Sequence, residues 1–230
     1  MEKKICPKGK EVCDCPEPKK KKRGPKVYKV KDPEPSTRFE GLHENLPSLP
    51  SLTLIIGSVR SAKSNLICNL LMNPEMFLNR FDIVKVISTT LHSCHKGKLL
   101  DKYFDATDTY SDSIIEDIKK SQSQYEATER PTFCLVLDDV LTKDFSKNNA
   151  VSFFSTRFRH YIDMYIIATQ SFRAVSGLIR NNATDVIITK QQNQKELDKI
   201  IEEYGDMFPS SDGAGDGQKN LMEMYKQAHK

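Results

Sequence analysis

Residues 52–64 read Leu-Thr-Leu-Ile-Ile-Gly-Ser-Val-Arg-Ser-Ala-Lys-Ser. An apolar run ends at Gly57, and a stretch with helical spacing follows Lys63 and Ser64. This is the layout of a P-loop, in which a strand leads through GxxxxGK(S/T) into a helix, except that Ala62 stands at the second glycine. The backbone N–H groups of such a loop and the positive end of its helix form a concavity that fits phosphate oxygens.

The P-loop pattern predicts a nucleotide site that binds ATP and Mg²⁺. Lys63 would reach the β- and γ-phosphates, and the Ser64 hydroxyl would ligate Mg²⁺. Alanine at position 62 costs roughly 1 kcal/mol or more if that position needs a positive φ, and is harmless if it already begins the helix. The alternative is an ordinary strand–turn–helix with an exposed lysine. The predicted cofactor-binding residues are Gly57, Ser58, Val59, Arg60, Ser61, Ala62, Lys63, Ser64 and Asn65.

A second motif, residues 133–139, reads Phe-Cys-Leu-Val-Leu-Asp-Asp and has the form of a Walker B segment. Ligands of parallel sheets bind beyond the carboxyl ends of the strands, so Asp138 is expected on the metal side of the P-loop, where it would hold Mg²⁺. Asp139 stands where a general base would polarise the attacking water. Since such ATPases usually have glutamate here, the shorter aspartate needs a closer water or a second one. The alternative is a strand that merely ends in acids.

Gln170 and several arginines complete the candidate catalytic set. Gln170 follows the apolar run 164–169, and its amide could contact both the attacking water and the γ-phosphate. Ring-forming ATPases often use an arginine from the neighbouring subunit to stabilise the transferring phosphoryl group. A solvated surface arginine is the plainer interpretation of each candidate. The candidates are Arg60, Arg157, Arg159, Arg173 and Arg180.

Short apolar runs alternate with stretches of helical spacing along the chain. This alternation predicts βαβ units and an α/β fold with a mostly parallel sheet covered on both faces. Strands are expected at 52–56, 82–88, 133–137, 164–169 and 184–189, and helices at 64–72, 111–127, 150–160 and 194–204, with a short helix or loop at 171–179.

Charge divides the chain unevenly. Residues 1–40 hold 13 Lys and Arg against 7 Asp and Glu, whereas the other 190 residues hold 22 against 24. The first segment is rich in proline and poor in aliphatic residues, so residues 1–45 are expected to form a disordered basic arm. Its run 19–26 is typical of a nucleic-acid-binding or nuclear-import patch, with a solubilising tail as the alternative. The P-loop core is expected at 46–208, followed by a Gly/Ser-rich linker and a short C-terminal tail at 209–230.

The composition argues against a membrane-spanning protein, a secreted protein and a zinc site near the N-terminus. No apolar run approaches the ~18 residues of a membrane span, so no span is expected. The N-terminus has no apolar signal core, and the six cysteines favour free thiols in a reducing compartment. Cys6, Cys13 and Cys15 offer three thiols without a nearby fourth ligand, so a zinc site is not expected there.

Together, these motifs resemble the genome-packaging ATPases of large DNA viruses, the poxvirus-type branch of the FtsK–HerA superfamily, which has relatives in virophages and Maverick-type elements. The similarity covers about residues 48–205 and is most specific at 170–182, which read Gln-Ser-Phe-Arg-Ala-Val-Ser-Gly-Leu-Ile-Arg-Asn-Asn. The resemblance implies a RecA-like (ASCE) core, Mg²⁺-dependent ATP hydrolysis, a hexameric or pentameric homo-oligomeric ring, and translocation of double-stranded DNA into a capsid. It also implies Asp139 as the base and favours Arg159, then Arg157, as the arginine finger.

The same resemblance implies partners and a location. A capsid or portal component would receive the DNA, in the cytoplasmic viral factory or nucleus of an infected host cell, or in association with the virion. Pore contacts with DNA would come from Lys143, Lys147, Arg173 or Arg180, because the residues after 40 are near neutral overall. Two alternatives stay open: a P-loop (deoxy)nucleoside-type kinase, and a non-catalytic DNA-binding scaffold with a decayed P-loop.

Overall fold

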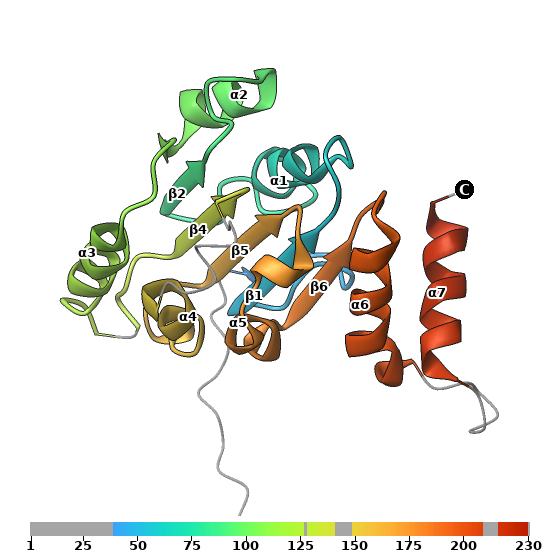
Figure 1. The fold of residues 1–230 in the computed structure, drawn as a ribbon. Coiled ribbons are helices and arrows are strands. Elements are labelled where there is room, and N and C mark those ends of the chain that lie inside the picture. The colour runs from blue at the N-terminus through green and yellow to red at the C-terminus, as the bar shows by residue number, and fades with distance from the viewer. Residues whose placement is uncertain (1–38, 127, 141–148, 209–215, 230) are drawn as a thin grey trace, which may run out of the picture. The chain divides into compact units, whose positions relative to one another are not determined.

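A six-stranded parallel sheet forms the centre of the fold (Figure 1). The computed structural model describes residues 39–126, 128–140, 149–208 and 216–229. The strand order is β3-β2-β4-β5-β1-β6, and each pair of neighbours is parallel, which confirms the predicted α/β class. The strands are β1 (Ser51–Ile56), β2 (Ile83–Ser88), β3 (Asp105–Thr107), β4 (Phe133–Asp138), β5 (Met164–Thr169) and β6 (Asp185–Ile188).

Helices follow the strands and cover both faces of the sheet (Figure 1). The α-helices are α1 (Lys63–Met72), α2 (His95–Tyr103), α3 (Asp112–Gln122), α4 (Asn149–Ser155), α5 (Gly177–Asn182), α6 (Gln194–Tyr204) and α7 (Gly217–Ala228). Short 3-10 helices in the described ranges include η3 (Phe158–His160), η4 (Phe172–Ala174) and η5 (Gly205–Met207).

Two apolar clusters on opposite faces of the sheet make up the core. Alternate residues of β1 serve different clusters: Leu54 packs with residues of α3, α4 and α5, and Ile55 packs with residues of α1 and α2. All residues of β1, β4 and β5 are buried, because both faces of these central strands are covered. The continuous apolar runs that predicted these strands reflect this two-sided burial.

Strand order brings the predicted motifs to one edge of the sheet. β5 lies between the P-loop strand β1 and the Walker B strand β4. Ile56 pairs with Thr169, and Asp138 pairs with Ala168. Since parallel strands end at the same edge, the residues after β1, β4 and β5 meet there.

Several elements differ from the sequence prediction. The expected helix at 111–127 ends at Gln122, the segment 150–160 splits into α4 and η3, and 171–179 splits into η4 and α5. α2 and β3 were not predicted. The sequence of α2, His-Lys-Gly-Lys-Leu-Leu-Asp-Lys-Tyr, is mostly polar, and β3 has three residues, so neither gives a clear hydrophobic period.

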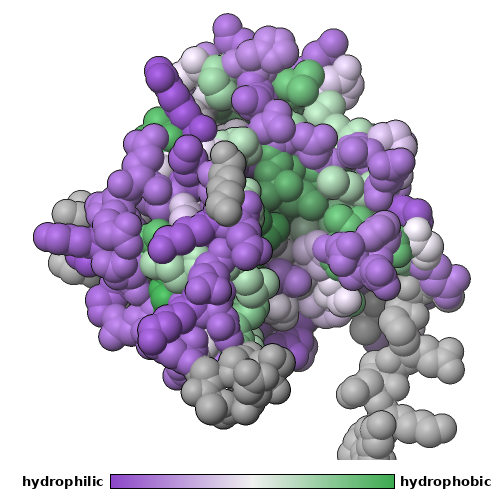
Figure 2. All heavy atoms as spheres, turned by 90° about the vertical axis from the view of Figure 1, so that its right-hand side faces the viewer, coloured by the Kyte–Doolittle hydropathy of each residue, from purple (hydrophilic) through white to green (hydrophobic). Residues whose placement is uncertain are grey.

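The packed chain extends past the predicted core at both ends. The Phe39 ring lies 5.8 Å from the Phe81 ring between centroids, and Leu42 packs on the α1 side of the core, so packing begins before residue 46. At the other end Leu221 of α7 packs with Leu197 and Ile201 of α6. Figure 2 looks onto the side that carries α7 and shows an apolar hollow bordered by hydrophilic side chains.

Some predictions concern residues outside the described ranges. These are Cys6, Cys13, Cys15, the basic run 19–26, most of the predicted arm, Lys143, Lys147 and the linker residues 209–215. Within the described ranges, no helix has the length and apolar character needed to cross a bilayer.

Candidate nucleotide site

The P-loop connects β1 to α1, and its first glycine is required by a close approach. A Cβ atom on Gly57 would lie 1.7 Å from Thr189 Oγ1 and 2.4 Å from Ser61 Oγ. Gly57 does not have a positive φ, so the close approach, and not the backbone conformation, requires glycine here. The end of β6 presses against the loop, and only a residue without a side chain fits between them.

Ala62 has a left-handed backbone, with φ 69° and ψ 15°, and α1 begins at the next residue. Of the two alternatives for this position, the strained one therefore holds, at a cost of roughly 1 kcal/mol or more. Arg60 also has a positive φ, 63°. Alanine keeps its backbone N–H, so the substitution for glycine removes no donor from the loop.

Lys63 is the first residue of α1, and its side chain is 5% exposed. Its Nζ donates to the carbonyl oxygens of Gly57, at 2.9 Å, and Ser58, at 3.2 Å. It also lies 3.8 Å from Asp139 Oδ1. The ammonium group is thus held between the loop backbone and the acidic pair at the end of β4.

Asp138 is the last residue of β4 and is almost fully buried. Its Oδ2 accepts hydrogen bonds from Ser88 Oγ, at 3.0 Å, and Ser64 Oγ, at 3.2 Å. Burial, reinforced by the charge of Asp139, raises the pKa of Asp138, while the two serine hydroxyls and Lys63 act in the opposite direction. The structure therefore joins the P-loop serine to the first Walker B acid.

The oxygen atoms around Asp138 fit a magnesium ion. Among the described residues, Asp138 Oδ1 is buried without a hydrogen-bond partner, which leaves one hard carboxylate oxygen available as a ligand. Ser64 supplies a hydroxyl oxygen on the same side. Oxygen donors of this kind are the ones that Mg²⁺ prefers.

Asp139 lies beyond the end of β4 with φ 53°, a left-handed conformation that aspartate tolerates better than most residues. Its backbone N–H donates to Ala168 O of β5 at 2.9 Å. Gln170 Nε2 donates to Asp139 Oδ2, also at 2.9 Å. The second acid, the residue after β5 and Lys63 therefore form one cluster, although they come from three separate parts of the sequence.

The arginine candidates lie in different places. Arg157 and Arg159 precede β5, so in this chain they lie toward the amino ends of the strands, away from the P-loop edge. The Arg157 guanidinium lies 4.6 Å from the centre of the Phe153 ring. Arg173 contacts Glu196, and Arg180 pairs with Glu203. Arg60 is exposed on the P-loop itself.

Three residues that contact the site were not predicted from the sequence. Ser88 ends β2 and Thr189 follows β6, so the rule used for Gln170, a polar residue at a strand end, would have found both. Glu196 is buried in the first turn of α6, although its sequence context is that of an exposed helix. It accepts hydrogen bonds from the backbone N–H groups of Phe172, at 2.8 Å, and Arg173, at 3.4 Å.

A pocket of about 500 Å³ opens between the P-loop and the start of α6. Its lining is mainly amide side chains, with one hydroxyl and one aliphatic group. The lining residues are Ser58, Val59, Gln170, Gln192, Asn193 and Gln194.

Comparison with known proteins gives one sequence relative and several similar folds. No family model matches the chain. "Uncharacterized protein 075L" of Invertebrate iridescent virus 6 is 30% identical over 166 residues, which make up 69% of this chain and 62% of that protein. The chain thus spans less than two thirds of the relative's length.

Solved structures with a similar fold include two named ATPases. The DNA-packaging ATPase B204 from Sulfolobus Turreted Icosahedral Virus has a TM-score of 0.47 and 18% identity, covering 67% of this chain and 82% of its own. EssC (ATPases 2 and 3) from Geobacillus thermodenitrificans has a TM-score of 0.49 and 13% identity, covering 66% of this chain and 34% of its own.

Proposed function

We propose that this protein is a Mg²⁺-dependent ATPase that moves double-stranded DNA and packages a viral genome into a capsid. The observation that carries the proposal is the cluster of Lys63, Ser64, Asp138, Asp139 and Gln170 at one edge of the sheet. These residues come from a P-loop, a Walker B strand and the strand between them. Their side chains match the parts that phosphoryl transfer needs: a phosphate cradle, a metal carboxylate, a base and a polar sensor.

The P-loop would hold the phosphates of ATP on its backbone N–H groups and on the start of α1. Lys63 would exchange its two carbonyl partners for the β- and γ-phosphate oxygens. Ser64 and Asp138 would hold Mg²⁺, whose charge neutralises the phosphates when it is bound. Ser88 would keep the Asp138 carboxylate oriented through its hydrogen bond to Oδ2.

Asp139 would act as the general base. Its Oδ2 is held by Gln170, whereas its Oδ1 has no hydrogen-bond partner among the described residues and could accept the proton of the attacking water. The Gln170 amide touches the base directly. Any contact that Gln170 makes with the γ-phosphate would therefore also shift Asp139, which suits a sensor of nucleotide state.

Completion of the site would need a second subunit. Arg159 and Arg157 lie away from the P-loop edge of their own chain, so either one would have to act on a neighbouring subunit in a hexameric or pentameric ring. The iridescent-virus relative supports a setting in a virus-infected cell. A capsid or portal component belongs to the same proposal.

The test is ATP hydrolysis by purified full-length protein, with and without long double-stranded DNA. The proposal expects Mg²⁺-dependent turnover that DNA stimulates and that Lys63→Ala abolishes. Turnover that ignores DNA but consumes a nucleoside acceptor would indicate a kinase instead. DNA binding without any ATP hydrolysis would indicate a non-catalytic scaffold whose P-loop does not support turnover.

A further inference from the structure

We propose that the exposed face of α2 contacts the phosphate backbone of double-stranded DNA and is connected to the Walker B acids through the turn after β2. This inference rests on the proposed function and identifies the surface through which the protein contacts DNA. α2 was absent from the sequence prediction, and none of the positions named there as pore contacts belongs to it.

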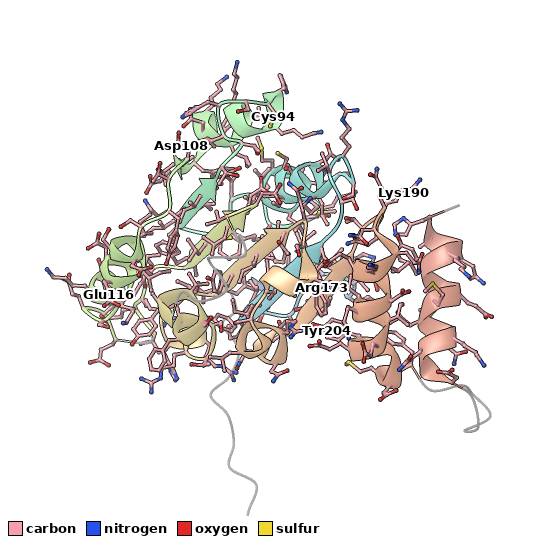
Figure 3. The ribbon with its side chains drawn as sticks, viewed as in Figure 1. Cys94, Asp108, Glu116, Arg173, Lys190 and Tyr204 are labelled. Atoms are coloured by element: carbon pink, nitrogen blue, oxygen red, sulfur yellow. The ribbon has the colours of Figure 1, made fainter. Side chains whose placement is uncertain are left out.

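The exposed surface of α2 carries three lysines against one acid, Asp101. Gly97 and Leu100 of the helix are buried, whereas Lys96, Lys98 and Lys102 are exposed. Residues 98 and 102 are one turn apart, and His95 precedes residue 98 by three positions, so these three side chains share a face, and Lys96 flanks it about 100° around the helix from His95. Figure 3 shows side chains of α2 projecting away from the sheet.

An exposed aromatic residue adjoins the lysines. Tyr103 at the end of α2 is 56% exposed, and Lys102 Nζ lies 5.2 Å from the centre of its ring. A tyrosine hydroxyl can donate to a phosphate oxygen, as many protein–DNA contacts do. The face thus offers several donors to an anionic polymer.

One acid, Asp101, shares the exposed surface of α2 with these lysines. Among the described residues, neither Lys96, Lys98 nor Lys102 forms an ion pair, and Asp101 lies toward His92, with 4.0 Å between Oδ2 and Nδ1. The two predicted pore residues within the described ranges differ in this respect. Arg173 contacts Glu196, and Arg180 pairs with Glu203, so their charge is already compensated.

The turn between β2 and α2 touches both Walker B acids. Ser88 Oγ donates to Asp138 Oδ2 at 3.0 Å, and Thr89 Oγ1 donates to the Asp139 carbonyl oxygen at 3.3 Å. α2 packs directly on this turn, since a Cβ atom on Gly97 would lie 2.1 Å from Leu91 O. A displacement of α2 would therefore be transmitted to the residues that hold the metal and the base.

The charge pattern favours a phosphate backbone as the occupant. The helix has 9 residues. At 1.5 Å per residue it is about 13 Å long, which corresponds to roughly four phosphates along one DNA strand. A convex basic helix reads no bases unless it enters a groove, so the expected contact is independent of sequence.

The experiment measures DNA affinity of the full-length protein as a function of salt. The test variant carries Lys96→Ala, Lys98→Ala and Lys102→Ala. The matched control carries Lys120→Ala, Lys219→Ala and Lys226→Ala, which removes the same charge from exposed lysines of α3 and α7. A third variant replaces the three α2 lysines by arginine. Melting temperatures of all variants verify that the fold is kept.

The inference expects the slope of log K against log [salt], which is negative, to become less negative by roughly 3 in the test variant, because each lost phosphate contact reduces its magnitude by about 0.9. The control and the arginine variant should keep the slope of the unmodified protein, and DNA stimulation of ATP hydrolysis should disappear only in the test variant. An unchanged slope in the test variant would overturn the inference, with the proposed function intact. An unmodified protein that hydrolyses ATP without any response to DNA would instead overturn the proposed function, and the inference with it.

Discussion

Ala62 keeps its backbone N–H donor in the P-loop but has a strained backbone conformation. Its φ of 69° is one that glycine adopts freely and alanine does not. The sequence identified the position as a departure from the motif, but it could not decide whether the residue belongs to the loop or to the helix. That choice depends on where α1 begins, which the loop geometry sets.

Ala62→Gly should therefore stabilise the protein. Relief of the left-handed strain is worth roughly 1 kcal/mol, partly offset by the larger chain entropy of glycine. Since only part of this gain remains, thermal unfolding should show a melting temperature higher by about 1–2 °C. Ala150→Gly, at a helical position without positive φ, serves as the control and should lower it. A decrease in the Ala62→Gly variant would contradict the strain.

Asp138 is expected to destabilise the nucleotide-free fold at neutral pH. Its pKa is raised on folding, chiefly by burial, so the ionised carboxylate is less favourable in the folded than in the unfolded chain. The destabilisation is absent when both states are protonated, below pH about 4, and is complete above the raised pKa.

Asp138→Asn should accordingly raise the melting temperature at pH 7 while it removes Mg²⁺-dependent hydrolysis. The gain in stability should shrink as the pH is lowered toward 4, which a series of thermal scans can measure. Asp198→Asn, an exposed acid on α6, is the matched control and should give no comparable gain. A lower melting temperature for Asp138→Asn at pH 7 would refute this explanation.

At the scale of elements, the segment from β6 into α6 connects the P-loop to the turn after Gln170. Thr189 Oγ1 donates to Ser61 Oγ at 2.7 Å, and the Gln192 N–H donates to Ser58 Oγ at the same distance. A few residues later Glu196 accepts from the N–H of Phe172 in η4. One segment therefore contacts both the P-loop and the residues that follow Gln170.

Glu196→Ala should loosen the turn after Gln170. A buried N–H without an acceptor costs about 1–3 kcal/mol, so the melting temperature should fall. If the turn positions Gln170, kcat should fall by about 10- to 100-fold with little change in KM, since misplacement acts on the reacting groups. Glu202→Ala, an exposed acid on the same helix, is the control. A variant with reduced stability but normal kcat would limit Glu196 to a structural role.

The elements differed in how well the sequence predicted them. β1, β4 and β5 are short apolar runs that end in polar residues, and burial on both faces makes that pattern unambiguous. α2 could not be found in this way, because its exposed face is basic and its buried residues include Gly97, which packs against Leu91 O. Tertiary contact, which the sequence pattern does not express, holds this helix in place.

The residues of the site also divide into those that a local sequence pattern predicts and those that depend on tertiary contacts. Lys63, Asp138, Asp139 and Gln170 were predicted because each lies at the end of a recognisable strand or in the P-loop. Ser88 and Thr189 obey the same rule on strands with weaker patterns. The burial of Glu196 depends on how α6 packs against η4, and no local feature of its sequence indicates that contact.

At the scale of the whole molecule, charge limits how the protein can attract DNA. Residues 41–230 hold 22 basic and 24 acidic side chains, so no general attraction for a polyanion arises from this part of the chain. Under the proposed function, DNA binding would then come from local basic surfaces, such as α2, and from the 13 basic residues of the first 40. Affinity should therefore depend steeply on salt concentration.

The most direct test of the central claim compares the unmodified protein with Asp139→Asn, measuring ATP affinity and ATP hydrolysis on the same preparation with Mg²⁺ present. If the cluster of Lys63, Asp138, Asp139 and Gln170 is a hydrolytic site, the variant should bind ATP nearly as well as the unmodified protein and hydrolyse it about 10²- to 10⁴-fold more slowly. Equal hydrolysis rates in the two proteins would contradict the account.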